Sequence, residues 1–195
     1  MKSLSPSQPH AIIMVGIPGS GKSFFAEKFA ETFNAPYISS GVIQKLSQTT
    51  SASADALSHA FLKEVCKTKQ SIVFDGSTET RTDRTKLAQI AKRAGYETLI
   101  VWVQTDPATA KNRSTRGTKE NPNTTTVESF DRAVKRFTPP SALEKPIVIS
   151  GKHTFATQAK IILKRLTEPR SSGVTTSDII PKRAQPRGKR TVFIR

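Results

Sequence analysis

The sequence of 195 residues is long enough for one domain with a hydrophobic core and too short for two large ones. Lysine and arginine number 31 against 15 aspartate and glutamate residues, and the resulting net charge of +16 favours polyanionic partners such as nucleic acids. No apolar run approaches the length of a membrane-spanning helix, no secretory leader is evident, and the single cysteine, Cys66, excludes an internal disulfide, so we expect a cytoplasmic protein.

Hydrophobic periodicity predicts strands that alternate with helices along most of the chain. Short runs rich in apolar or β-branched residues indicate strands, and apolar residues that recur every three to four positions indicate helices. The predicted order is strand 11–15, helix 22–33, strand 36–38, helices 42–46 and 54–67, strand 71–75, helix 81–94, strand 97–103, helices 107–114 and 127–137, strand 146–150 and helix 155–166.

This order predicts an α/β fold of three layers, in which helices cover both faces of a five-stranded parallel sheet. The segment 116–126 lacks periodicity and is expected to be an exposed loop, part of a lid near 113–126. We expect a flexible N-terminus over 1–9, the domain over 10–167, and a basic, disordered tail over 168–195. A short strand near the end of that tail could instead dock on the sheet edge.

The motif GIPGSGKS, from Gly16 to Ser23, follows the first predicted strand and opens the first predicted helix. It fits the P-loop pattern at every fixed position, so the fold class is that of a P-loop NTPase of the kinase type. In such a loop, glycines turn backbone N–H groups toward phosphate oxygens, and the helix dipole adds to the attraction. The motif predicts a site for ATP and Mg²⁺, in which Lys22 reaches the β- and γ-phosphates and Ser23 ligates the metal. The nucleotide-binding residues are expected to be Gly16, Gly19, Ser20, Gly21, Lys22 and Ser23.

Three further residues have the chemistry that phosphoryl transfer requires. Asp75 ends the predicted strand SIVFD, where a carboxylate can hold Mg²⁺ through water or act as a base. Arg113 and Arg116 precede the expected lid, and lid arginines neutralise the charge that develops during transfer. The predicted catalytic residues are therefore Lys22, Asp75, Arg113 and Arg116.

Three segments in the same order resemble small P-loop kinases of the group that includes AAA-type polynucleotide kinases, zeta-type toxins and chloramphenicol-type phosphotransferases. These are GIPGSGKS, then DGSTETRTDR from Asp75 to Arg84, similar to that group's D-x-T-N segment with its following arginine, and then KNRSTRGTKENP from Lys111 to Pro122, similar to the polynucleotide-kinase lid. The resemblance covers roughly residues 10–167. It implies ATP as the phosphoryl donor and a hydroxyl acceptor such as a nucleic-acid 5′-end.

The sequence departs from this group after the second predicted strand. The group carries there an aspartate that takes the proton from the acceptor hydroxyl, followed by an arginine, whereas this chain has Gly41 and Gln44. A glycine cannot accept a proton. Asp75, Asp55 or Glu79 could replace the missing base, with Asp75 as the first choice.

Two functions therefore follow from the sequence. The first is an ATP-dependent kinase acting on a hydroxyl, with a polynucleotide 5′-end favoured by the charge. The second is a nucleotide-binding module or slow ATPase that associates with nucleic acid through its basic surface and tail; a zeta-type toxin would share the same fold. Lys152, which follows the last predicted strand, is a further candidate for a place beside the nucleobase.

Overall fold

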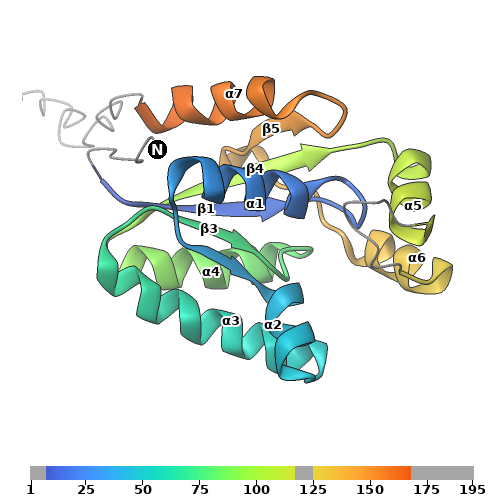
Figure 1. The fold of residues 1–195 in the computed structure, drawn as a ribbon, viewed down its shortest axis with the longest axis horizontal. Coiled ribbons are helices and arrows are strands. Elements are labelled where there is room, and N and C mark those ends of the chain that lie inside the picture. Colours follow the sequence, from blue (N-terminus) through green and yellow to red (C-terminus); the bar gives the residue numbers. More distant parts are fainter. Residues whose placement is uncertain (1–7, 117–124, 168–195) are drawn as a thin grey trace, which may run out of the picture.

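Five parallel strands form one sheet in the order β2-β3-β1-β4-β5. The computed structural model describes residues 8–116 and 125–167 (Figure 1). The strands are β1 (His10–Val15), β2 (Tyr37–Ser39), β3 (Ile72–Asp75), β4 (Glu97–Gln104) and β5 (Ile147–Ser150). Because all strands run the same way, the loops that follow them gather at one edge, the carboxyl edge of the sheet.

Helices cover both faces of the sheet (Figure 1). One face is covered by α1 (Lys22–Phe33) and α7 (Phe155–Thr167), and the other by α3 (Ser51–Val65) and α4 (Arg81–Arg93). The short helix α2 (Ser40–Ser47) packs on α3, and α5 (Pro107–Arg116) packs on α6 (Val127–Arg136) near the carboxyl edge. Two 3₁₀ turns, η1 (Cys66–Thr68) and η2 (Ala142–Glu144), complete the described elements.

The central strand β1 supplies both hydrophobic cores. Ile12 and Met14 point into the core beneath α1 and α7, whereas Ala11, Ile13 and Val15 point into the core beneath α3 and α4. All five side chains are fully buried. Burial of an Ile or Val side chain contributes about 1.5–3 kcal/mol, so β1 fixes the position of the loop that follows it.

The predicted fold class is confirmed, and the differences concern element ends. Helix α2 begins at Ser40 rather than at 42 because Ser39 Oγ accepts a hydrogen bond from Val42 N at 3.3 Å, which caps the helix. Helix α3 begins at Ser51 because Thr50 Oγ1 caps it in the same way, through Ser53 N. The turn η2 was not predicted, since three residues carry no periodicity.

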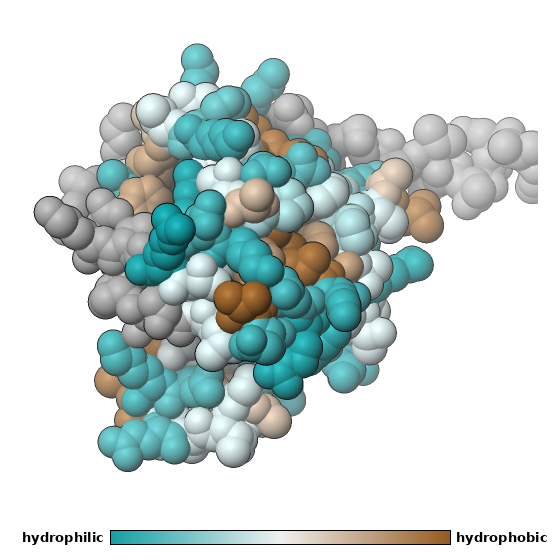
Figure 2. Space-filling model, turned by 90° about the vertical axis from the view of Figure 1, so that its right-hand side faces the viewer, coloured by the Kyte–Doolittle hydropathy of each residue, from teal (hydrophilic) through white to brown (hydrophobic). Residues whose placement is uncertain are grey.

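The carboxyl edge faces the viewer in Figure 2, where hydrophilic residues surround a small apolar patch near the middle. Within the described residues, no helix is both long and apolar enough to cross a membrane. The predicted tail 168–195, and residues 117–124 of the predicted lid, lie outside the described residues.

Candidate functional site

The loop between β1 and α1 has a backbone that requires glycine. Gly16, Gly19 and Gly21 have φ angles of 151°, 73° and 101°. A Cβ on Gly16 would lie 2.7 Å from the carbonyl oxygen of Val103, and one on Gly19 would overlap the carbonyl oxygen of Ala110. A Cβ on Gly21 would meet no atom within 4 Å, so the loop is packed on one side and open at Gly21. This curled backbone fits a polyphosphate.

Charged and polar side chains of the loop also fit a triphosphate. Lys22 Nζ donates a hydrogen bond to the carbonyl oxygen of Ile17 at 3.1 Å. Burial lowers the pKa of the Lys22 ammonium, and the carboxylates of Asp75 and Glu79 partly oppose this shift. Ser20 Oγ is buried without a hydrogen-bond partner among the described residues. A bound phosphate would provide the Lys22 ammonium with a further acceptor.

The back of the P-loop is braced by the loops that follow β4 and β5. Thr105 Oγ1 donates a hydrogen bond to the carbonyl oxygen of Ser20 at 2.9 Å. Gly151 packs so closely that a Cβ there would overlap both Thr105 Oγ1 and the Ser20 carbonyl. Arg113 on α5 donates a hydrogen bond from Nη1 to the Gly151 carbonyl at 3.2 Å, which joins the base of the predicted lid to this brace.

Lys152 lies just beyond this brace. It lines a cavity of about 530 Å³ at the carboxyl edge, together with Ile17 of the P-loop and Trp102 of β4. Its side chain is exposed, and its charge helps to lower the pKa of Asp106, after the larger effect of the hydrogen bonds from Thr109. Lys152 therefore borders a hollow beside the P-loop, while its place next to a nucleobase stays a prediction.

Asp75 lies at the end of β3, beside the P-loop strand. Its side chain is buried, with 6% exposed, and its Oδ2 accepts a hydrogen bond from the Tyr37 hydroxyl at 3.3 Å. Burial, and then the charge of Asp75, raise the pKa of Tyr37 well above its usual value, so this hydroxyl stays protonated and donates. Asp75 also acts electrostatically on Lys22, which places the carboxylate near the phosphate side. No motif or spacing in the sequence indicates this contact.

The predicted acceptor side of the site is built from α2, α3 and the segment after Asp75. Gly76 has no room for a side chain, because a Cβ would overlap Ser40 Oγ. Ser77 Oγ donates a hydrogen bond to Asp55 Oδ2 at 2.6 Å, which brings a second carboxylate to the same region. Glu79 is half-buried nearby. The three carboxylates considered as replacement bases thus come from one end of the fold.

The two residues that depart from the expected pattern both lie on α2. Gly41 and Gln44 are exposed. A Cβ on Gly41 would meet only Ser39 Oγ, at 3.8 Å, and its backbone is not in the left-handed region. The backbone at this position therefore accepts an aspartate, so packing does not explain the glycine.

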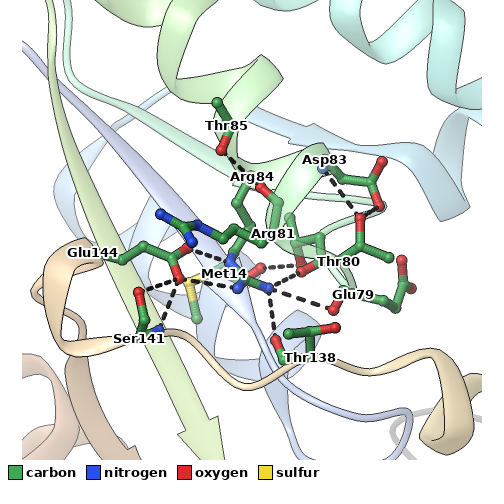
Figure 3. Close-up of polar contacts among 11 residues, drawn as sticks. Met14, Glu79, Thr80, Arg81, Asp83, Arg84, Thr85, Thr138, Ser141 and Glu144 are labelled. Atoms are coloured by element: carbon green, nitrogen blue, oxygen red, sulfur yellow. Dashed lines mark hydrogen bonds and ion pairs between the residues drawn. The ribbon is translucent and has the colours of Figure 1, made fainter.

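A buried arginine holds the segment that follows Asp75 (Figure 3). Arg84 is 1% exposed and binds both carboxylate oxygens of Glu144, through Nε at 2.6 Å and Nη2 at 3.1 Å. Its Nη1 donates to the carbonyl oxygens of Thr78 at 3.0 Å and Thr138 at 2.9 Å. Burial works in the opposite direction, but hydrogen bonds from Arg84 and Ser141 hold the pKa of Glu144 below its usual range.

Thr78 adds a second anchor to the same segment. Its hydroxyl donates to the carbonyl oxygen of Met14 in β1 at 2.7 Å. The segment between Asp75 and α4 is thus tied to the central strand and to α4 at once. The sequence pointed to Arg84 only through resemblance, and it gave no signal for Glu144, which lies 60 residues away.

The predicted magnesium residues are Ser23, in the first turn of α1, and Asp75. Within residues 8–116 and 125–167, no group of three or more His, Cys, Asp or Glu side chains could hold a metal ion by itself. A magnesium ion here would therefore need phosphate oxygens to complete its coordination, as is usual in kinases. Arg116 ends α5 and is exposed, and the structure brings it into no described contact with the loop.

Comparison with protein families matches residues 12–140 to an AAA domain, AAA_33. The chain belongs to this family. The match spans the P-loop, Asp75 and Arg113, and the AAA_33 domain has the fold of P-loop kinases. No curated protein matches the sequence.

Solved structures share the fold of this AAA_33 domain at low sequence identity. A gluconokinase from Sinorhizobium meliloti 1021 aligns with a TM-score of 0.61 and 19% identity, over 81% of this chain and 91% of that one. Kti12 of Chaetomium thermophilum, in complex with ADP-AlF3, aligns with a TM-score of 0.65 and 18% identity, over 80% and 96%. The APS kinase CysC of Mycobacterium tuberculosis, in complex with AMPPNP and APS, aligns with a TM-score of 0.59 and 14% identity, over 83% and 99%.

Proposed function

We propose that the protein is an ATP-dependent kinase that transfers the γ-phosphoryl group of ATP·Mg²⁺ to a hydroxyl acceptor, with a polynucleotide 5′-end as the favoured acceptor. The observation that carries this proposal is that the P-loop and Asp75 lie at the carboxyl ends of two neighbouring parallel strands, β1 and β3. A lysine of lowered pKa begins α1, and a buried carboxylate at the end of β3 acts on it electrostatically. A donor-binding group and an acceptor-activating group thus share one edge of the sheet. The kinases among the structural neighbours, and the ligands ADP-AlF3 and AMPPNP in their complexes, agree with a nucleotide at this edge.

In the proposed reaction, the acceptor oxygen attacks the γ-phosphorus while the bond to the β-phosphate oxygen breaks, and ADP leaves. Lys22 and the P-loop amides hold the β- and γ-phosphates. Asp75, oriented by Tyr37, takes the proton of the acceptor hydroxyl. Arg113 and Arg116, near the end of α5, would neutralise the charge that develops on the transferring group. Bound Mg²⁺, held by Ser23 and through water by Asp75, would neutralise the charge between the two phosphates.

The test is transfer of labelled γ-phosphate from ATP·Mg²⁺ to a panel of acceptors. The panel contains 5′-hydroxyl DNA and RNA, nucleosides, nucleotide sugars and small alcohols, and Lys22→Ala is the control. Label in one acceptor class, lost in the control, would establish a kinase and name its substrate. A transfer rate for Lys22→Ala within a few-fold of wild type would refute the site.

A second function, a nucleotide-binding module or slow ATPase, is favoured by Gly41. The space around a Cβ at Gly41 allows an aspartate, so the variant Gly41→Asp tests the two functions directly. A module that has lost its base should gain transfer activity with this variant. A kinase that relies on Asp75 should gain little or lose activity, because the added carboxylate repels the phosphates.

A further inference from the structure

Helix α4 has a basic surface that the proposed kinase reaction does not use. Its exposed residues are Arg81, Thr82, Thr85, Lys86, Gln89, Lys92 and Arg93. None of them is acidic. The single acidic residue of the helix, Asp83, is half-buried and accepts a hydrogen bond from Thr80. We call these seven residues the α4 basic face.

The cations of the α4 basic face form two rows. At 100° per residue, Arg81 and Lys92 lie within about 20° of each other around the helix axis, and so do Lys86 and Arg93. The rows are roughly 120° apart, and Thr85 and Gln89 lie between them. At 1.5 Å per residue, the first row spans about 16 Å and the second about 10 Å. Two rows of charge with hydrogen-bonding side chains between them match a chain of phosphates and sugars.

None of the four cations of the α4 basic face forms an ion pair with an acidic residue that the structure describes. The ion pairs within residues 8–116 and 125–167 involve other cations, namely those of His10, Lys67, Arg84 and Lys111. By contrast, the surface of α6 carries Glu128 and Asp131 beside its basic residues. A row of like charges without counter-charges raises the local potential and attracts a polyanion.

The position of α4 connects this surface to the proposed acceptor side. The helix begins five residues after Gly76, so Arg81 lies where the segment from Asp75 to Thr80 ends. From there the helix runs away from the carboxyl edge, and Lys69 meets its far end by donating from Nζ to the Ala94 carbonyl at 2.7 Å. The buried ion pair between Arg84 and Glu144 ties α4 to the turn η2.

We propose that the α4 basic face binds the sugar-phosphate backbone of a single-stranded nucleic acid, and that it guides the 5′-hydroxyl end of this strand to Asp75. This inference rests on the proposed function. A 5′-hydroxyl terminus carries no phosphate on its first oxygen, so it suits the acidic environment of Asp75, Asp55 and Glu79. The phosphates that follow it then meet Arg81 and the two rows of the α4 basic face.

The experiment compares two double variants of the full chain that remove the same charge from opposite faces of the sheet. Lys86→Gln with Lys92→Gln alters the α4 basic face, and Lys160→Gln with Lys164→Gln alters exposed positions on α7. Glutamine has nearly the same helix propensity as lysine, so both variants should fold. The probe is a 12-nucleotide DNA strand with a 5′-hydroxyl and a 3′-fluorophore, and its affinity is measured from 50 to 200 mM salt.

We expect the α4 variant to bind more weakly than wild type and to lose dependence on salt. Two lost phosphate contacts reduce the slope of log affinity against log salt by about 1.4. Between 50 and 200 mM, the fall in affinity should therefore be about sevenfold smaller than in wild type. The α7 variant should stay near wild type.

Equal losses in both variants would overturn the proposal, because they would show attraction to net charge alone. No binding by wild type would also overturn it. Phosphoryl transfer to a 5′-hydroxyl dinucleotide is measured in parallel, since this acceptor is too short to span α4. If the α4 variant loses strand binding while no acceptor is phosphorylated, strand binding by the α4 basic face stands, whereas the proposed kinase and the guidance of the 5′-hydroxyl to Asp75 both fail. If wild type phosphorylates a small alcohol and binds no strand, the kinase stands and the inference fails.

Discussion

Glu144→Gln should strongly destabilise the protein although it replaces only one oxygen by an NH₂ group. Arg84 is 1% exposed, and its guanidinium forms two short hydrogen bonds with the Glu144 carboxylate, whose side chain is 13% exposed. The amide keeps the shape of the carboxylate but places an NH₂ donor against an N–H donor of Arg84. The buried positive charge would then retain only carbonyl partners, chiefly those of Thr78 and Thr138.

Glu144→Gln should lower the free energy of unfolding by about 3 kcal/mol. Removal of one partner of a buried ion pair destabilises proteins by about 3–5 kcal/mol, because an uncompensated charge remains inside. Because Glu144 is partly exposed, we expect a loss at the lower end of this range. Domains of this kind have a free energy of unfolding of about 5–15 kcal/mol, so the effect should be plain in a urea titration.

The control is Asp131→Asn, which makes the same chemical change in an exposed pair. Asp131 accepts from Lys111 at 2.9 Å, and the two side chains are 49% and 37% exposed. Asp131→Asn should lower the free energy of unfolding by at most about 1 kcal/mol. Equal losses in the two variants would refute the role assigned to Arg84.

The difference in free energy of unfolding between wild type and Glu144→Gln should also depend on pH. The pKa of Glu144 is lowered in the folded protein, so its carboxylate contributes stability above the pKa of the unfolded chain. This contribution is lost as pH falls through the lower, folded pKa. A difference that stays constant into the acid range would show that the charge of Glu144 is not what stabilises the fold.

Three further predictions concern the nucleotide site. Lys22→Met should lower phosphoryl transfer by about 100-fold or more. It should also raise the unfolding temperature of the nucleotide-free protein, because burial lowers the pKa of Lys22 and its charge therefore destabilises the fold. This rise in unfolding temperature should shrink as pH approaches the pKa of an unfolded lysine, and a thermal scan without any rise would contradict the prediction. Asp75→Asn should reduce transfer by roughly 10²–10⁴-fold at saturating Mg²⁺ if Asp75 is the base, whereas a shift only in the Mg²⁺ concentration required would assign it to the metal. Thr105→Val removes the bond to the Ser20 carbonyl, about 1 kcal/mol, and should weaken ATP binding roughly fivefold in calorimetry; unchanged affinity would show that the brace is not needed.

The fold and the phosphate loop could be predicted because their signals are local. The spacing of apolar residues alternates between the strand and helix patterns, and this predicted the order of the strands and helices. The P-loop motif lies within eight consecutive residues. Asp75 could be predicted for the same reason, since the apolar strand and the acid that ends it lie within five consecutive residues, SIVFD. The helix ends were less certain because they depend on single caps such as Ser39.

The rest of the site depends on contacts between distant residues. Tyr37 and Asp75 are 38 residues apart, Arg84 and Glu144 are 60 apart, and Thr105 and Ser20 are 85 apart. No period or spacing in one sequence reports such pairs. The composition gives the net charge, but only the fold shows that α4 presents its basic residues on one unpaired face.

The two halves of the candidate site are supported by different parts of the fold. The P-loop is braced by the loops after β4 and β5, through Thr105, Gly151 and Arg113. The predicted acceptor side is built instead from α2, α3 and the segment held by Arg84. Gly41, which departs from the pattern expected from the sequence resemblance, lies in the second half. Among the described residues, the braces of the P-loop do not include α2, so a substitution at Gly41 should leave the geometry of the P-loop unchanged.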